Sequence, residues 1–207
     1  RKYADPPGAV VVPKVFAQLI TYTSFDDTQV RMFILSPNEI ADTPRSTVLY
    51  GYGGFGVGLN PVFSASALAW VEAGGVWAVA NIRGGDEEGE EWHRQGMRGE
   101  KQNVFDDFIY AAKYLIDNGW TSHEKLAIEG GSNGGLLVGA ALTQRPDLFA
   151  AVVCSAPLLD MVRYELHGLG ATWSDEYGSA AIEEEFEWLI GYSPYHQVRE
   201  GESYPAT

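Results

Sequence analysis

The sequence predicts an α/β domain in which a mostly parallel sheet is flanked by helices. Strand-like and helix-like segments alternate along the chain, a pattern typical of parallel strands joined by right-handed crossovers. Residues 130–135 form a glycine-rich turn between one strand-like segment and the helix-like segment after it. The length of 207 residues, with 45% hydrophobic and 20% charged residues, is enough to bury one sizeable core.

The predicted strands are short apolar runs bounded by turn-forming or charged residues. In chain order they are residues 15–23, 29–35, 46–50, 76–82, 125–129 and 150–154. The acidic pair Asp26-Asp27 separates the first two runs, which indicates an antiparallel hairpin. A hairpin on the N-terminal side of a mostly parallel sheet fits the α/β-hydrolase fold. We predict that fold, truncated at the C-terminal end.

The predicted helices lie between these strands. Residues 64–73 have helical patterning, and a second helix is expected from an N-cap at Asn103 to Gly119, with apolar residues at helical spacing. Residues 136–142 form an apolar, alanine-rich helix start. Residues 183–188 are expected to be an amphipathic surface helix with an acidic face.

Composition and charge exclude several classes of function. The formal net charge of −14 would repel phosphate backbones and anionic membranes, so we expect no nucleic-acid partner. No apolar run reaches membrane-spanning length, and we expect a cytoplasmic protein without membrane association.

The acidic run 86–91, followed by His93, is expected to be a solvated loop, and residues 83–85 a turn, so no metal or cofactor is implied. Cys154 is expected to pack in the core, and the oligomeric state is left open.

Residues 130–135, Gly-Gly-Ser-Asn-Gly-Gly, fit a serine nucleophile held on a sharp strand-to-helix turn. The small residues at 130 and 134 would let strand and helix approach closely, leaving the hydroxyl of Ser132 exposed above the sheet. The alternative is a glycine-rich turn with an incidental serine. The flanking strand and helix favour the nucleophile.

Two groups are candidates for an oxyanion hole. The N–H of Asn133 follows the nucleophile, as the geometry of such a turn requires. A second donor would come from the glycine-rich loop at residues 50–55, where the hydroxyl of Tyr52 could donate. A glycine turn with aromatic packing explains the same loop equally well.

A serine nucleophile also needs a base that is oriented by a third group. In this fold the acid and then the histidine follow the serine in sequence. Only His167 and His196 follow Ser132, and both are expected at helix ends or turns. We therefore expect the base and the acid to lie beyond Thr207.

Several stretches together resemble the prolyl oligopeptidase family of serine peptidases, over nearly the whole chain from about Ile20. They are Tyr50-Gly-Tyr-Gly-Gly-Phe55, Ala80-Asn-Ile-Arg-Gly-Gly85, Gly130-Gly-Ser-Asn-Gly-Gly135, Gln144-Arg-Pro-Asp-Leu-Phe149, Trp173-Ser-Asp-Glu-Tyr-Gly178, Phe186-Glu-Trp-Leu-Ile190 and Ser193-Pro194. Asn133 sharpens the resemblance, because an aromatic residue there would suggest dipeptidyl peptidases and an alanine would suggest oligopeptidase B.

The resemblance implies a role for each matching residue. Ser132 corresponds to the nucleophile, and Tyr52 and the N–H of Asn133 to the oxyanion donors. Trp173 corresponds to the ring on which the substrate proline stacks. The other walls of that pocket would be Phe55, Leu158 and Tyr177, with the Asn133 side chain nearby. An aromatic slot suits proline, whose flat apolar ring carries no N–H.

The implied function is a serine endopeptidase that hydrolyses short peptides on the C-terminal side of proline through an acyl-enzyme on Ser132. Two departures accompany the resemblance: we expect the family's β-propeller to be absent from these residues, and we expect its catalytic Asp and His to lie beyond Thr207. We therefore expect residues 1–13 to be a linker or remnant of a preceding region and residues 14–207 a partial catalytic domain, inactive alone. The alternatives are a related serine peptidase or esterase, and a non-catalytic peptide-binding module.

Overall fold

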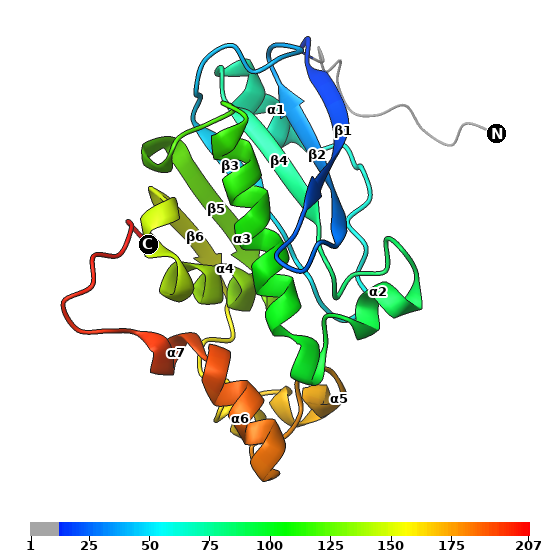
Figure 1. The fold of residues 1–207 in the computed structure, drawn as a ribbon, viewed down its shortest axis with the longest axis vertical. Helices are drawn as coiled ribbons and strands as arrows, with labels where there is room; N and C mark the ends of the chain where they lie inside the picture. Colours follow the sequence, from blue (N-terminus) through cyan, green and yellow to red (C-terminus); the bar gives the residue numbers. More distant parts are fainter. Residues whose placement is uncertain (1–12) are drawn as a thin grey trace.

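The computed structural model describes residues 13–207, which fold around a six-stranded mixed sheet (Figure 1). The strands are β1 (Phe16–Thr23), β2 (Gln29–Ser36), β3 (Thr47–Tyr50), β4 (Val76–Asn81), β5 (Leu126–Gly131) and β6 (Ala151–Ser155). Each predicted strand is present, with ends within about two residues of those expected. The predicted linker at residues 1–13 lies outside the described residues, apart from Pro13.

The sheet joins an antiparallel part to a parallel part in the order β1-β2-β4-β3-β5-β6. β2 pairs antiparallel with β1 and β4, whereas β3 is parallel to β4 and β5, and β5 to β6. The predicted hairpin is therefore confirmed, and its turn places Asp27 at φ 66°, a conformation that aspartate tolerates better than most residues. At the other edge, Ala206 forms a parallel bridge with Ala151 of β6.

Seven α-helices occur within residues 13–207. They are α1 (Ala65–Glu72), α2 (Glu90–Arg94), α3 (Gln102–Asp117), α4 (Asn133–Gln144), α5 (Ser174–Tyr177), α6 (Glu183–Tyr192) and α7 (Pro194–Gln197). Short 3-10 helices are η1 (Arg98–Glu100), η2 (His123–Lys125), η3 (Pro146–Leu148), η4 (Tyr164–Leu166) and η5 (Gly170–Trp173).

The prediction that Asn103 caps α3 is wrong, because η1 runs almost directly into the helix. Lys101 occupies the cap position, and its carbonyl accepts from the Val104 N–H. The Asn103 side chain lies within the first turn and donates to the Gln95 carbonyl and the Glu100 carboxylate instead. The 3-10 turn η1 therefore leads directly into α3, and no side-chain cap is needed to begin the helix.

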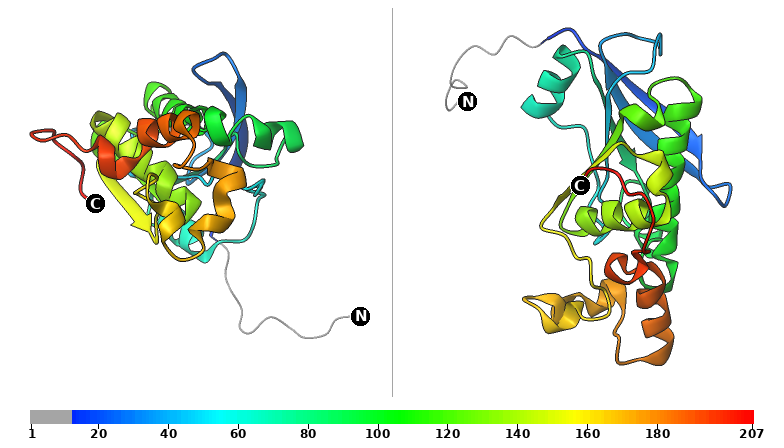
Figure 2. Two further views of the ribbon diagram at one scale, coloured as in Figure 1. Left: turned by 90° about the horizontal axis from the view of Figure 1, so that it is seen from below. Right: turned by 90° about the vertical axis from the view of Figure 1, so that its left-hand side faces the viewer.

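The helices cover the two faces of the sheet unequally (Figure 2). α3 packs with α4 on one face, and α1 lies on the other. The period-two alternation of β2 matches this arrangement, since Val30, Met32 and Ile34 are fully buried in the core toward α3. Phe33 and Leu35 of the same strand face the side of α1. The core thus lies mainly between the sheet and the α3–α4 layer.

The topology directs two loops to one place at the edge of the sheet. β3 lies between β4 and β5, and the chain leaves it first toward β4 and later returns on its other side as β5. Because β3 and β5 are parallel neighbours, with Tyr50 opposite Glu129, their carboxyl ends lie side by side. Such a switch point is where open α/β sheets bind ligands. Separately, no helix of the described residues has the length and apolar character needed to cross a membrane.

Candidate active site

The turn after β5 holds Ser132 in a strained backbone conformation. Its φ is 58° and its ψ is −119°, and its N–H donates to the Ser155 carbonyl at 3.0 Å. Non-glycine residues in sparsely populated regions of this kind concentrate at functional sites. Ser132 is exposed, whereas the residues that follow it in the first two turns of α4 are buried. The serine alone therefore emerges from the packed junction of strand and helix.

Glycines on either side of Ser132 make this turn possible. A Cβ atom on Gly130 would lie 2.0 Å from the carbonyl oxygen of Gly134, and one on Gly134 would lie 2.8 Å from that of Gly51. These contacts are with backbone, which cannot swing aside as a side chain could. The close approach of β5, α4 and the loop after β3 therefore depends on the absence of side chains there.

The Asn133 side chain ties the neighbouring loops together beneath the serine. Its Nδ2 donates to the Tyr52 carbonyl at 2.6 Å, and its Oδ1 accepts from the Tyr177 hydroxyl at 2.8 Å. The residue is only 1% exposed. The resemblance placed this side chain near the pocket, and in the structure it lies under the pocket and supports two residues that line it.

A cavity of about 160 Å³ opens beside Ser132. Its lining residues are Tyr52, Phe55, Ser132, Leu158, Trp173 and Tyr177. They come from the loop after β3, the turn after β5, the segment after β6, and η5 with α5. The structure therefore brings together all the predicted site residues, Asn133 included, although they span more than half of the chain.

The aromatic side of the cavity is rigidly packed. The Phe55 and Tyr177 rings meet edge to face, with centroids 5.5 Å apart, and Tyr177 also meets Tyr164 edge to face at 5.4 Å. Tyr177 is fully buried, which keeps its phenol protonated because burial raises its pKa far above the ordinary value. The Tyr177 hydroxyl therefore remains a hydrogen-bond donor to Asn133 at physiological pH.

Neither downstream histidine lies at this cavity. His167 ends η4 and is exposed, and His196 lies in α7, where its Nδ1 is 2.8 Å from the Ser193 hydroxyl. Both therefore take the helix-end positions that the sequence indicates. Within residues 13–207, no histidine lines the cavity beside Ser132.

Buried charges near the site escaped the sequence-based reasoning. The sequence predicts only a turn at Arg83, yet its guanidinium is buried and pairs with Asp107 at 2.7 Å and with Asp26 at 2.6 Å. Lys101 and Glu176 are also buried and pair with each other at 3.0 Å. Sequence spacing does not reveal such pairs, because it does not show that a charged side chain has a distant partner.

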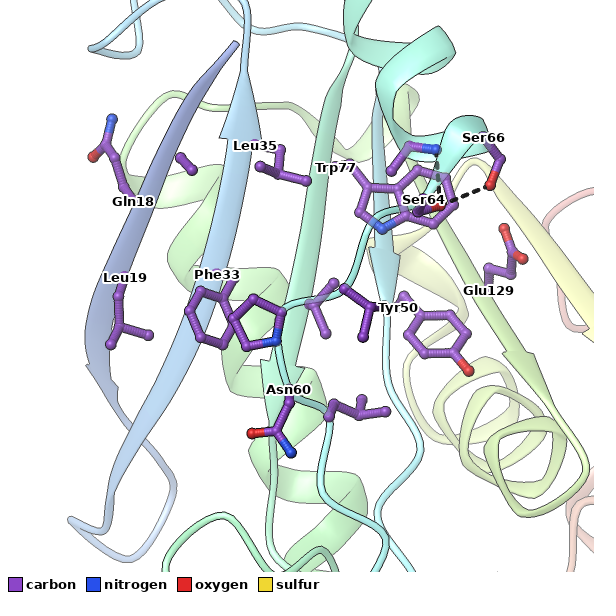
Figure 3. Close-up of a pocket in the computed structure, with 16 residues that line it drawn as sticks. Gln18, Leu19, Phe33, Leu35, Tyr50, Asn60, Ser64, Ser66, Trp77 and Glu129 are labelled. Atoms are coloured by element: carbon purple, nitrogen blue, oxygen red, sulfur yellow. Dashed lines mark hydrogen bonds between the residues drawn. The ribbon is translucent and has the colours of Figure 1, made fainter. Parts of the chain in front are cut away.

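A second cavity, of about 640 Å³, lies on the face of the sheet near α1 (Figure 3). It is lined mostly by apolar side chains of β1, β2 and β4, such as Phe33, Leu35 and Trp77. The Ser64 hydroxyl there accepts from the Ala67 N–H and pairs with Ser66, so it caps α1. This groove offers apolar surface without a strained nucleophile, which favours the smaller cavity as the site.

The fold and the serine turn define the class of the protein: it is an α/β-hydrolase, whose hairpin-led sheet presents a Gly-x-Ser-x-Gly turn after a central strand. A model of the prolyl oligopeptidase family matches residues 61–207. The chain belongs to the prolyl oligopeptidase family, as the resemblance indicated.

Individual relatives agree with this assignment. A prolyl endopeptidase from Elizabethkingia miricola is 46% identical over 193 residues, covering 92% of this chain and 27% of the relative. A structure from an analysis of two prolyl endopeptidases superposes with a TM-score of 0.91 at 54% identity, over 93% of this chain and 28% of the other. A post-proline cleaving enzyme from Rickettsia typhi gives a TM-score of 0.90 at 41% identity, over 92% and 28%. The chain thus spans about a quarter of the length of the proteins it matches.

Proposed function

We propose that this chain is the nucleophile-bearing part of a serine endopeptidase that cleaves short peptides on the C-terminal side of proline. One observation carries the proposal: exposed Ser132 stands at the mouth of a small cavity with aromatic walls. All three relatives described above are named for cleavage at proline, which supports the same reaction.

In the proposed reaction, the Ser132 oxygen attacks the carbonyl carbon of the proline residue. The peptide C–N bond then breaks, and the departing amine takes up the proton that Ser132 gave to the base. Water hydrolyses the resulting acyl-enzyme, which releases the new C-terminal carboxyl group and regenerates the serine. The Asn133 N–H and the Tyr52 hydroxyl would donate to the oxygen that becomes negatively charged. Loss of one such donor typically lowers turnover by about 10²–10³. The Ser132 proton needs a base within hydrogen-bond reach, and no histidine of residues 13–207 lines the cavity.

The cavity supports selectivity for one small apolar ring. Its volume of about 160 Å³ is below the range of roughly 300–1,000 Å³ typical of pockets that hold a whole ligand. It therefore suits a single side chain, with the rest of the peptide outside. The Trp173 ring would contact the face of the proline ring, and Phe55 and Tyr177 would close the sides.

A binding measurement on the chain as it stands tests the pocket without requiring turnover. We expect acetyl-Ala-Gly-Pro-amide to bind about tenfold more tightly than acetyl-Ala-Gly-Ala-amide, because burying about two more methylene groups contributes about 1.6 kcal/mol. Titration calorimetry measures both constants. Trp173→Ala should abolish the preference, whereas Trp70→Ala, a change on α1, should retain it. Equal affinity of the unaltered chain for the two peptides would contradict the proposal.

The same experiment tests the first of two alternatives, and the second requires a measurement of Ser132 reactivity. A related serine peptidase or esterase of this fold would bind other acyl groups at least as well as the prolyl peptide. A non-catalytic peptide-binding module would show the proline preference without ever using Ser132 as a nucleophile.

A further inference from the structure

A buried lysine lies between the oxyanion loop, residues 51–55, and the pocket helix α5. Lys101 is 1% exposed, and its Nζ donates to the Gly53 carbonyl and to Glu176 Oε1, each at 3.0 Å. The same ammonium group lies 5.2 Å from the centre of the Tyr177 ring. A single charge therefore contacts the loop after β3 and two consecutive residues of α5.

The carboxylate of Glu176 extends this contact to a third element. Glu176 is 4% exposed, and its Oε2 lies 2.7 Å from Nε2 of His93 on α2. Lys101, Glu176 and His93, hereafter the charge cluster, thus join α2, the start of α3 and α5. Burial lowers the pKa of Lys101, and Glu176 opposes that shift by favouring the charged amine.

The charge cluster fixes one of two adjacent carbonyl groups in the oxyanion loop. The Tyr52 carbonyl accepts from Asn133, and the Gly53 carbonyl accepts from Lys101. Gly53 takes a positive φ of 66°, and Gly84 packs so closely that a Cβ there would lie 2.5 Å from the Gly53 oxygen. Buried donors therefore orient the two successive peptide planes that directly follow the Cα atom of Tyr52.

The pocket helix is linked to this loop by two parallel routes. One runs from Tyr177 through Asn133 to the Tyr52 carbonyl, and the other from Glu176 through Lys101 to the Gly53 carbonyl. Packing alone does not need the second route, because an apolar pair of similar volume is often equally stable or more stable than a buried ion pair. The charged pair adds a directional hydrogen bond, which an apolar pair cannot supply. The Lys101 ammonium group donates to the Gly53 carbonyl and so fixes the orientation of that peptide plane.

We propose that Lys101, Glu176 and His93 are positioning residues that hold the oxyanion loop in register with the aromatic pocket. This role rests on the proposed function. If the charge cluster holds the loop and the pocket together, recognition of the proline ring and stabilisation of the oxyanion depend on one another. Without the charge cluster, the loop would keep its contacts with Asn133 but lose the orientation of the Gly53 carbonyl.

Amide hydrogen exchange in the ligand-free chain tests the positioning directly. The Gly56 and Val57 N–H groups report on the loop, because they donate to the carbonyls of Gly84 and Gly54 at 3.0 Å. In the paired variant Lys101→Met/Glu176→Leu, which leaves no buried charge unpartnered, we expect both amides to exchange at least tenfold faster. Arg145→Met, which removes an ion pair with Asp147 outside the site, should leave their exchange unchanged.

A second pair of variants covers the case in which the paired variant does not fold. His93 is 24% exposed in its side chain, so its replacement disturbs the core little. His93→Ala should accelerate exchange of the two loop amides, and His93→Gln, which can still hydrogen bond to Glu176, should restore it. Wild-type exchange in a folded paired variant, or in His93→Ala, would overturn the proposal.

Peptide affinity separates this proposal from the proposed function. We expect the paired variant to lose at least tenfold in affinity for acetyl-Ala-Gly-Pro-amide and less for the alanine peptide. If the unaltered chain shows no proline preference while loop exchange responds to the variants, the positioning stands and the proposed function fails. If the preference exists and survives in every variant with unchanged exchange, the positioning proposal fails alone.

Discussion

Asn133 shows how one side chain can serve two parts of a site. Its backbone N–H is the proposed oxyanion donor, and its side-chain amide bonds to the Tyr52 carbonyl and the Tyr177 hydroxyl. The backbone role follows from the position after Ser132, so the sequence pattern predicts it. The side-chain role could not be predicted from spacing, because Tyr177 lies 44 residues away and reaches Asn133 only through the fold.

Replacing Asn133 with alanine should destabilise the chain by about 2–4 kcal/mol. The change leaves the buried Tyr177 hydroxyl and the Tyr52 carbonyl without partners, and each unpaired buried group costs about 1–3 kcal/mol. Urea denaturation followed by tryptophan fluorescence measures the free energy of unfolding. Asn118→Ala, at the exposed end of α3, is the matched control and should lose well under half as much. Equal losses of unfolding free energy in the two variants would contradict a stabilising role for the buried hydrogen bonds of Asn133.

Gly130→Ala tests the requirement for a bare backbone at the serine turn. The added methyl group would lie 2.0 Å from the Gly134 carbonyl oxygen, so β5 and α4 must separate, and we expect a loss of about 3 kcal/mol or more. Gly191→Ala in α6, where a Cβ meets nothing within 4 Å, should be neutral or stabilising. Midpoints of urea unfolding compare the two. A stable Gly130→Ala variant with normal tertiary circular dichroism would contradict the packing described for the turn.

The β1–β2 hairpin is anchored to the sheet by ion pairs as well as by strand pairing. Arg83, at the end of β4, pairs with Asp26 in the hairpin turn and with Asp107 of α3, and the Tyr22 hydroxyl donates to the Asp107 carbonyl. Strand positions were predicted well because alternating burial leaves a clear sequence pattern. The anchor was missed because its partners lie on three different elements.

The hairpin anchor should make stability depend on pH in the acid range. Hydrogen bonding to Arg83 lowers the pKa of Asp26 to about 2. Because this value is below the ordinary one, the stabilisation is complete above about pH 4 and is lost as the pH falls toward 2. Asp26→Asn should therefore unfold more readily at pH 7 and show a shallower decline of stability between pH 4 and pH 2.

Thermal unfolding at pH 7, 4, 3 and 2 measures that slope for Asp26. Asp117→Asn, at the exposed end of α3, is the control and should retain the acid dependence of the unaltered chain. If Asp26→Asn keeps the full decline between pH 4 and pH 2, the carboxylates responsible lie elsewhere.

The parallel topology of the sheet explains why part of the site could be predicted from the sequence. The loops after β3 and β5 leave neighbouring parallel strand ends, which brings Tyr52 and Ser132 close together. Topology did not predict which aromatic residues line the cavity. Trp173 and Tyr177 belong to short helices at the carboxyl end of the sheet, and their place at the cavity came from the family resemblance alone.

The absence of a histidine beside Ser132 within residues 13–207 leads to a prediction about the reactivity of this serine. Ser132 is exposed and strained, yet no histidine of residues 13–207 lines its cavity, and removing the histidine of a serine triad lowers turnover by about 10⁶-fold. A fluorescent prolyl phosphonate should therefore label the 207-residue chain no faster than it labels the Ser132→Ala variant. Intact-mass spectrometry over several hours counts the adducts, and circular dichroism confirms that both proteins are folded. Stoichiometric labelling that requires Ser132 would contradict this expectation, because a base must then lie within hydrogen-bond reach of the hydroxyl.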